Sequence, residues 1–98
     1  MTYKIKALEK FNEQVINLDK KSKRIIEGKI QLIKENPFRF KKLHTKSYSR
    51  IFRVRLRIQS NDMRLIYAVI EPNIILICLL ERKKDYKDLE KYLNNLKK

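Results

Sequence analysis

An alternation of apolar and arginine residues is the feature of this sequence that most constrains its fold. It runs from Phe52 to Ile58, and the positions between the apolar residues are Arg53, Arg55 and Arg57. Because successive side chains of a β-strand point to opposite faces, this segment should bury one face and hold three guanidinium groups on the other. Folding does not require a row of repelling charges. The pattern therefore predicts a strand that meets a polyanion.

The basic character extends well beyond this strand. No acidic residue occurs between Glu35 and Asp62, and the 98 residues carry 25 Lys and Arg against 11 Asp and Glu, a formal net charge of +14. Such a balance favours association with nucleic acid or another anionic surface. The length predicts a single domain over residues 1–98, large enough to fold without disulfides.

The cysteine content and the apolar runs indicate the cellular setting. The single cysteine, Cys78, excludes an internal disulfide and fits a reducing cytoplasm, and its apolar neighbours predict that it is buried. The longest apolar stretch, 74–80, is too short to cross a membrane, and the first residues do not resemble a signal peptide. We therefore expect a cytoplasmic protein with no membrane-spanning segment.

The spacing of apolar residues predicts an α+β domain. The expected order is an N-terminal strand, a two-helix hairpin, a three-stranded antiparallel meander and a C-terminal helix, with the helices packed on one face of the sheet. We place the strands at 3–7, 50–58, 63–70 and 74–81, joined in the meander by turns at 59–62 and 71–73. The last strand is apolar on both faces, so it should be central or covered on both sides.

The helical hairpin is expected between the first two strands. Its first helix carries an apolar stripe over 8–18, and its second helix is capped by Asp19 or Ser22. Pro37 should end the second helix, because the residue before a proline disfavours the helical conformation. The following segment, 38–49, has no clear period and is expected to be a basic loop.

Arginine and lysine are distributed differently along the chain. Six of the eight arginines lie in the expected meander or at its end: Arg50, Arg53, Arg55, Arg57, Arg64 and Arg82. Arginine presents a flat fork that binds phosphate oxygens in pairs, whereas the lysines of the helices keep their surface solvated. Across a four-residue turn Arg64 should approach Arg57, and Arg82 should close the patch. The alternative is a solvated strand face with acidic partners from the helices.

The sequence offers few groups for chemistry other than charge stabilisation. The only histidine, His44, is expected at the surface of the basic loop, and no His/Cys cluster could hold a metal. The only glycine, Gly28, lies in a helical pattern, so a phosphate-binding loop is absent. We therefore expect no metal and no cofactor. Catalysis would use cations around a phosphate. A last helix is expected to begin at Asp85. Tyr86 in this helix is either a proton carrier or an aromatic residue of the core.

These patterns together resemble the RelE/ParE toxin superfamily. The resemblance covers nearly the whole chain and is carried by the alternating basic strand at 53–57, by the run Arg64-Leu65-Ile66-Tyr67, and by Arg82 four residues before Tyr86. Within this superfamily we expect a toxin of the RelE type. That resemblance implies a ribosome-dependent, metal-independent endoribonuclease that cuts mRNA in the A site through the 2′-hydroxyl beside the cleaved phosphate. It also implies a RelB-type antitoxin that forms a hetero-oligomer with the toxin on apolar surface left by the helices.

The resemblance also assigns roles to residues of this sequence. It implies catalytic roles for Arg53, Arg55, Arg64, Arg82 and Tyr86. RNA contacts are expected from Arg50, Arg57, Lys41, Lys42 and Lys46. Well-studied members of the family carry lysine at the positions of Arg53 and Arg55, and some carry a basic residue at the position of Leu80. Since arginine stays protonated, Arg53 and Arg55 should neutralise charge rather than accept a proton.

Two other functions are compatible with these residues. One is a ParE-type toxin, which shares the fold and inhibits DNA gyrase by binding. The other is a basic module that binds RNA or the ribosome without cleavage. The three readings differ in whether translation or supercoiling stops first, and in whether any message is cut.

Overall fold

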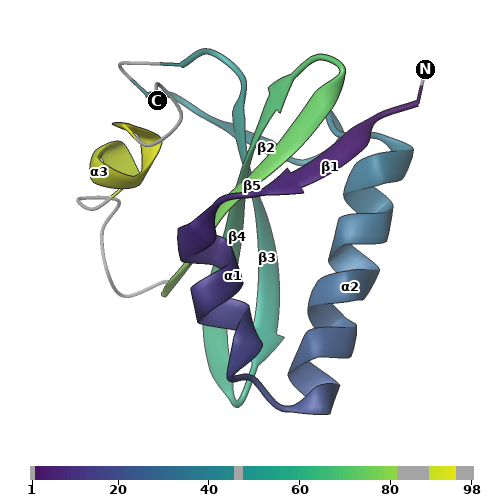
Figure 1. Cartoon of the computed structure of the whole chain (residues 1–98), viewed down its shortest axis with the longest axis vertical. Coiled ribbons are helices and arrows are strands. Elements are labelled where there is room, and N and C mark those ends of the chain that lie inside the picture. The colour runs from purple at the N-terminus through teal and green to yellow at the C-terminus, as the bar shows by residue number, and fades with distance from the viewer. Residues whose placement is uncertain (1, 46–47, 82–88, 95–98) are drawn as a thin grey trace.

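The computed structural model of the chain describes residues 2–45, 48–81 and 89–94. Its elements in chain order are β1 (Lys4–Ala7), α1 (Glu9–Ile16), α2 (Lys20–Glu35), β2 (Lys41–Leu43), β3 (Ile51–Ile58), β4 (Asn61–Ile70), β5 (Asn73–Glu81) and α3 (Leu89–Leu93). The strands form a five-stranded sheet in the order β1-β5-β4-β3-β2, in which β1 runs parallel to β5 and the other neighbours are antiparallel. The α+β class and the expected order of elements are confirmed, with β2 as one additional strand (Figure 1).

Helices α1 and α2 run in opposite directions over one face of the sheet (Figure 1). Asp19 is the N-cap residue of α2, and the hydrogen bond from the Ser22 side chain lowers the pKa of its carboxyl. The helix ends at Glu35, just before Pro37, as expected. Buried residues of the two helices, such as Phe11 and Ile33, pack against β3, β4 and β5. None of the helices in the described part of the chain is long and apolar enough to cross a membrane.

The last helix lies on the opposite face of the sheet. Leu89 and Leu93 of α3 are buried with Ile66 and Cys78, whereas the neighbouring strand residue Leu65 faces α1 and α2. The expectation that all helices share one face is therefore wrong for α3. The reason is that β4 and β5 are apolar on both faces, so one helical layer cannot remove all of their apolar surface from water. The central, doubly covered position expected for β5 is confirmed.

The segment 38–49 contains a short strand where a loop was expected. This strand, β2, pairs with the start of β3, so that Lys41 lies opposite Arg53 and Leu43 lies opposite Ile51. A strand of three residues is too short to show an alternating pattern in the sequence. Because β2 is so short, it pairs only with the start of β3. Among the described residues, no strand pairs with the outer edge of β3 from Val54 to Ile58.

Side-chain hydrogen bonds fix two elements to the sheet. The hydroxyl of Tyr67 on β4 donates to the backbone oxygen of Pro37 at 2.6 Å, which holds the segment that leads into β2. Burial raises the pKa of this tyrosine. The amide group of Gln14 on α1 donates to the backbone oxygen of Leu79 at 2.8 Å and accepts from its N–H at 2.7 Å. Both contacts join segments that lie far apart in the sequence.

Cys78 of β5 is buried on the face of the sheet that α3 covers, as its apolar neighbours predicted. Burial raises the pKa of its thiol from 9.0 to about 12. The folded protein therefore holds this proton more tightly than the unfolded chain does. The resulting stabilisation is complete below pH 9 and is lost as the pH rises towards 12.

We expect a thiol reagent to label Cys78 very slowly in the folded protein below pH 9 and rapidly after unfolding in urea. The free energy of unfolding should also fall as the pH rises above 9, and this fall should be smaller in Cys78→Ala. Labelling kinetics and urea titrations at several pH values would measure both effects. Rapid labelling of the folded protein would contradict the burial of this thiol.

Candidate nucleic-acid interface

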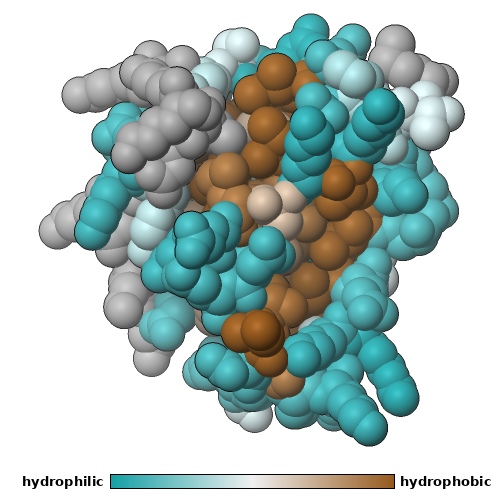
Figure 2. Space-filling view, viewed as in Figure 1, coloured by the Kyte–Doolittle hydropathy of each residue, from teal (hydrophilic) through white to brown (hydrophobic). Residues whose placement is uncertain are grey.

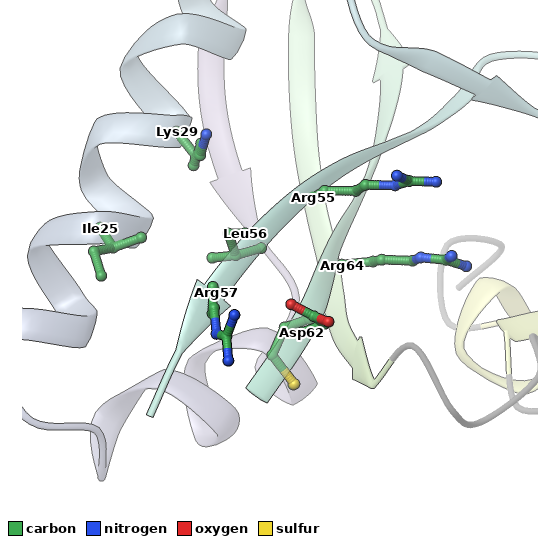
Figure 3. Close-up of a pocket in the computed structure, with 8 residues that line it drawn as sticks. Ile25, Lys29, Arg55, Leu56, Arg57, Asp62 and Arg64 are labelled. Atoms are coloured by element: carbon green, nitrogen blue, oxygen red, sulfur yellow. The ribbon is translucent and has the colours of Figure 1, made fainter. Parts of the chain in front are cut away.

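The register between β3 and β4 determines which cations lie together. Arg55 lies directly opposite Arg64, and Arg57 lies opposite Asp62. Residues directly opposite in an antiparallel pair share a face, with Cβ atoms about 4.5–5.5 Å apart. Figure 3 shows the guanidinium groups of Arg55 and Arg64 side by side, both pointing away from α2. We call this pair the arginine clamp.

The sequence predicted that Arg64 would lie near Arg57, whereas in the structure Arg64 lies opposite Arg55. The difference comes from the turn, which has two residues rather than four, since Ile58 pairs directly with Asn61. Gln59 and Ser60 form the turn with φ values of 51° and 64°. Positive φ at both central residues suits the tight turns that match the twist of a hairpin. This turn shifts the register, so that Asp62 rather than Arg64 lies opposite Arg57.

The three arginines of β3 share a face but differ in exposure. Arg53 is only 7% exposed, whereas Arg55 and Arg57 are exposed. Arg53 lies opposite Ile66, a core residue of the α3 side. Its charge therefore adds to the positive potential of the site from beneath the surface, while Arg55 and Arg57 are accessible to a ligand.

The structure separates the basic residues expected to bind RNA. Lys41 lies opposite Arg53, so it shares the face of the clamp, whereas Lys42 lies opposite Phe52, on the face covered by α1 and α2. Arg50 precedes β3 at the other end of the hairpin from Arg57. Its Nη1 lies 3.2 Å from a carboxylate oxygen of Glu71, and its guanidinium carbon lies 5.6 Å from the centre of the Phe38 ring.

Three of the predicted site residues, Lys46, Arg82 and Tyr86, lie outside the described residues. The described end of β5 is Glu81, which pairs with Met63, the residue before Arg64. His44 is exposed, as expected. No cluster of three or more potential metal ligands occurs within residues 2–45, 48–81 and 89–94.

A cavity of about 490 Å³ adjoins the clamp. It is lined by residues of α2, β3 and β4, namely Ile25, Lys29, Arg55, Leu56, Arg57, Asp62, Met63 and Arg64 (Figure 3). Leu56 and Met63 belong to the core beneath α1 and α2, whereas the clamp projects from the other face. The cavity therefore extends around the uncovered edge of β3 and joins a basic surface to an apolar one.

Asp62 is the functional candidate that the sequence interpretation missed. Its position in a run of turn-forming residues placed it in a loop, but the structure places it in β4 and in the lining of the cavity. It is the one carboxylate among the described residues of that lining. The side chains of this surface can therefore stabilise negative charge through arginine, and one carboxylate lies beside the clamp.

The fold can be compared with those of known proteins. No protein-family model matches the chain, and no curated protein matches it in sequence. Among solved structures, a double arginine-to-alanine variant of the E. coli toxin RelE in the free state is similar with a TM-score of 0.68 and 19% identity, over 99% of this chain and 97% of that chain. The same variant in complex with a peptide of the antitoxin RelB is similar with a TM-score of 0.67 and 18% identity, over 93% and 95%.

The intact E. coli RelBE toxin–antitoxin complex is also similar to this chain. The TM-score is 0.65 with 15% identity, over 86% of this chain and 100% of the matched chain. The similarity therefore spans the whole domain while the sequences have diverged widely. The chain has the fold of the RelE toxin, which confirms the fold expected from the resemblance.

Proposed function

We propose that this protein is the toxin of a type II toxin–antitoxin system and a ribosome-dependent endoribonuclease that cleaves mRNA in the A site. The fold supports this proposal because the similar structures described above are of the E. coli toxin RelE. The observation that carries it is the arginine clamp, in which Arg55 and Arg64 lie opposite each other. Two guanidinium groups at opposite positions concentrate positive charge at one point of the sheet, which favours an anionic ligand there.

The clamp suits the reaction that the RelE resemblance implies. In that reaction the 2′-oxygen forms a bond to the adjacent phosphorus, the bond from phosphorus to the 5′-oxygen breaks, and negative charge grows on the phosphoryl oxygens. Two guanidinium forks can each donate paired hydrogen bonds to those oxygens and neutralise the growing charge. Buried Arg53 would add positive potential beneath them.

Proton transfer would require a group other than these arginines, because a guanidinium remains protonated at cellular pH. We propose that Tyr86 or a water molecule takes this role and that Arg82 adds a further phosphate contact. The site would then act without a metal ion. The ribosome would contribute by holding the message in the geometry that the reaction needs.

We propose an acidic antitoxin as the protein partner, matching the formal charge of +14. Figure 2 shows apolar surface exposed over the sheet between α1 and α2, and Ile16 of α1 is 68% exposed. An amphipathic segment of the antitoxin could bury this surface. Co-purification of the chain with the product of a neighbouring gene would support this partner, and purification of the chain alone from its native host would contradict it.

The function is tested by inducing the chain in cells and mapping the 5′ ends of ribosome-bound mRNA. We expect translation to stop and new 5′ ends to appear within codons of the A site, and isolated ribosomes with purified protein should reproduce the cuts. Intact message with tight RNA binding would indicate the non-catalytic module instead. Loss of DNA supercoiling before translation stops would indicate a ParE-type toxin.

A further inference from the structure

An exposed lysine lies beside the arginine clamp on the neighbouring strand. Lys41 of β2 pairs with Arg53, which lies two residues before Arg55 on the same face of β3. Lys41 and Arg55 are therefore diagonal neighbours across the two strands. Such neighbours lie about 7–8 Å apart, which is within the reach of long side chains. When one phosphate of an RNA strand binds the clamp, an adjacent phosphate can therefore meet the ammonium group of Lys41.

The strand that carries Lys41 holds this residue only weakly by itself. β2 has three residues, and the pair of Lys41 with Arg53 is the first pair of its ladder with β3. The end of so short a strand opens readily, because few neighbouring hydrogen bonds oppose the opening. A second constraint on the chain before Lys41 is therefore needed to keep its ammonium group beside the clamp.

Tyr67 on β4 supplies such a constraint. Its hydroxyl donates to the backbone oxygen of Pro37 at 2.6 Å, and Pro37 lies four residues before Lys41. The side chain of Tyr67 is 0% exposed, and its ring stacks on Phe52 with centroids 5.4 Å apart, so the hydroxyl has little freedom to move. Burial raises the pKa of Tyr67, so the hydroxyl keeps the proton that it donates. This hydrogen bond therefore ties the chain before β2 to the core of the sheet.

We propose that Tyr67 is a positioning residue for RNA binding that acts through Lys41, an inference that rests on the proposed function. The hydrogen bond to Pro37 fixes the start of the segment leading into β2, and the ladder with β3 fixes its end. Lys41 is thereby held in place before RNA arrives, so that less ordering is required on binding. Tyr67 itself is buried in the core on the other face of the sheet from the clamp.

The test is a double-mutant cycle of Tyr67→Phe and Lys41→Ala, with the affinity for a short fluorescent oligouridylate measured by anisotropy. Lys41→Ala should weaken binding by about two- to fivefold and reduce the slope of log K against log salt by about 0.7. Tyr67→Phe should weaken binding by up to the same factor. The double variant should bind no more weakly than Lys41→Ala alone, because the hydroxyl acts only through that lysine.

Two controls separate positioning from stability and from overall charge. Val69→Ala removes buried core surface two residues along β4 and on the same face as Tyr67, without touching the bond to Pro37. It should lower the urea midpoint, as Tyr67→Phe does, but keep the RNA affinity of the wild-type protein. Lys34→Ala removes an exposed lysine of α2 and should also keep that affinity. All affinities would be measured where circular dichroism shows each variant to be folded.

A second variant tests the same idea with Tyr67 in place. One glycine inserted after Arg39 lengthens the segment between Pro37 and Lys41, and surface segments of this kind tolerate such insertions. It should weaken RNA binding in the wild-type background and have no effect in Lys41→Ala. If Tyr67→Phe does not fold, this insertion completes the cycle in its place.

Additive effects of the two changes, or wild-type affinity and salt dependence in Lys41→Ala, would overturn the inference. Non-additivity is a readout that a purely structural role of Tyr67 would not produce. The proposed function fails differently, because it requires the wild-type protein to cut message on ribosomes. The cycle measures binding of single-stranded RNA, so it reports on Tyr67 and Lys41 whether or not any message is cut.

Discussion

Replacing Arg64 with alanine is expected to slow ribosome-dependent cleavage by about 10²–10³-fold. The reason is geometric: Arg64 and Arg55 form the clamp, and removing one guanidinium group leaves the growing charge on the phosphate with fewer donors. Binding of RNA should weaken much less, with the slope of log K against log salt falling by about 0.7 for the loss of one phosphate contact. Single-turnover cleavage and a salt titration of RNA binding would measure the two effects separately.

Arg24→Ala is the matched control for this prediction, because Arg24 is exposed on α2 and does not line the cavity. It should cleave at the wild-type rate. Arg64→Lys should restore only part of the rate, since lysine supplies the charge but not the planar pair of donors. A full rate in Arg64→Ala, with the urea midpoint unchanged, would contradict the role of the clamp.

Replacing Phe52 with alanine is expected to lower the free energy of unfolding by about 3–5 kcal/mol. The ring of Phe52 is only 4% exposed and stacks on Tyr67 with centroids 5.4 Å apart, and Phe38 packs edge-on against its other side at 5.8 Å. Small domains are stable by only about 5–15 kcal/mol, so this loss should leave a substantial fraction unfolded at 37 °C. Urea denaturation followed by circular dichroism would measure it.

Phe38→Ala serves as the control, because that ring belongs to the same aromatic group but is 45% exposed. Its cost should be clearly smaller. Phe52 also lies between Arg53 and Ile51 on β3, so its removal should loosen the strand that carries the clamp. A cost below about 1 kcal/mol for Phe52→Ala would show that the core can close around the missing ring.

The local patterns of the sequence predicted most of the elements but not all of their positions. The alternation at 52–58 predicted β3 because side-chain direction in a strand is set by the strand itself. The face occupied by α3 was not predictable in this way. The stripe that includes Leu89 and Leu93 shows that the helix is amphipathic, but it does not show which side of the sheet the helix covers.

The residues of the candidate site were also predictable from the sequence only in part. The sequence predicted that the arginines of β3 and Arg64 are the cationic residues of a phosphate site, and the structure places Arg55 and Arg64 opposite each other. It did not identify their pairing, because the register depends on a turn in which Gln59 and Ser60 adopt positive φ without a glycine to signal it. Asp62 was missed for the same reason.

The sequence alone determined that this protein would carry a row of arginines on one face of a sheet strand, since that row follows from charge and a period of two. Only the tertiary structure decided which arginines face each other, which one is buried, and that a carboxylate lies beside them. These features depend on strand register, which arises from contacts between residues far apart in the chain.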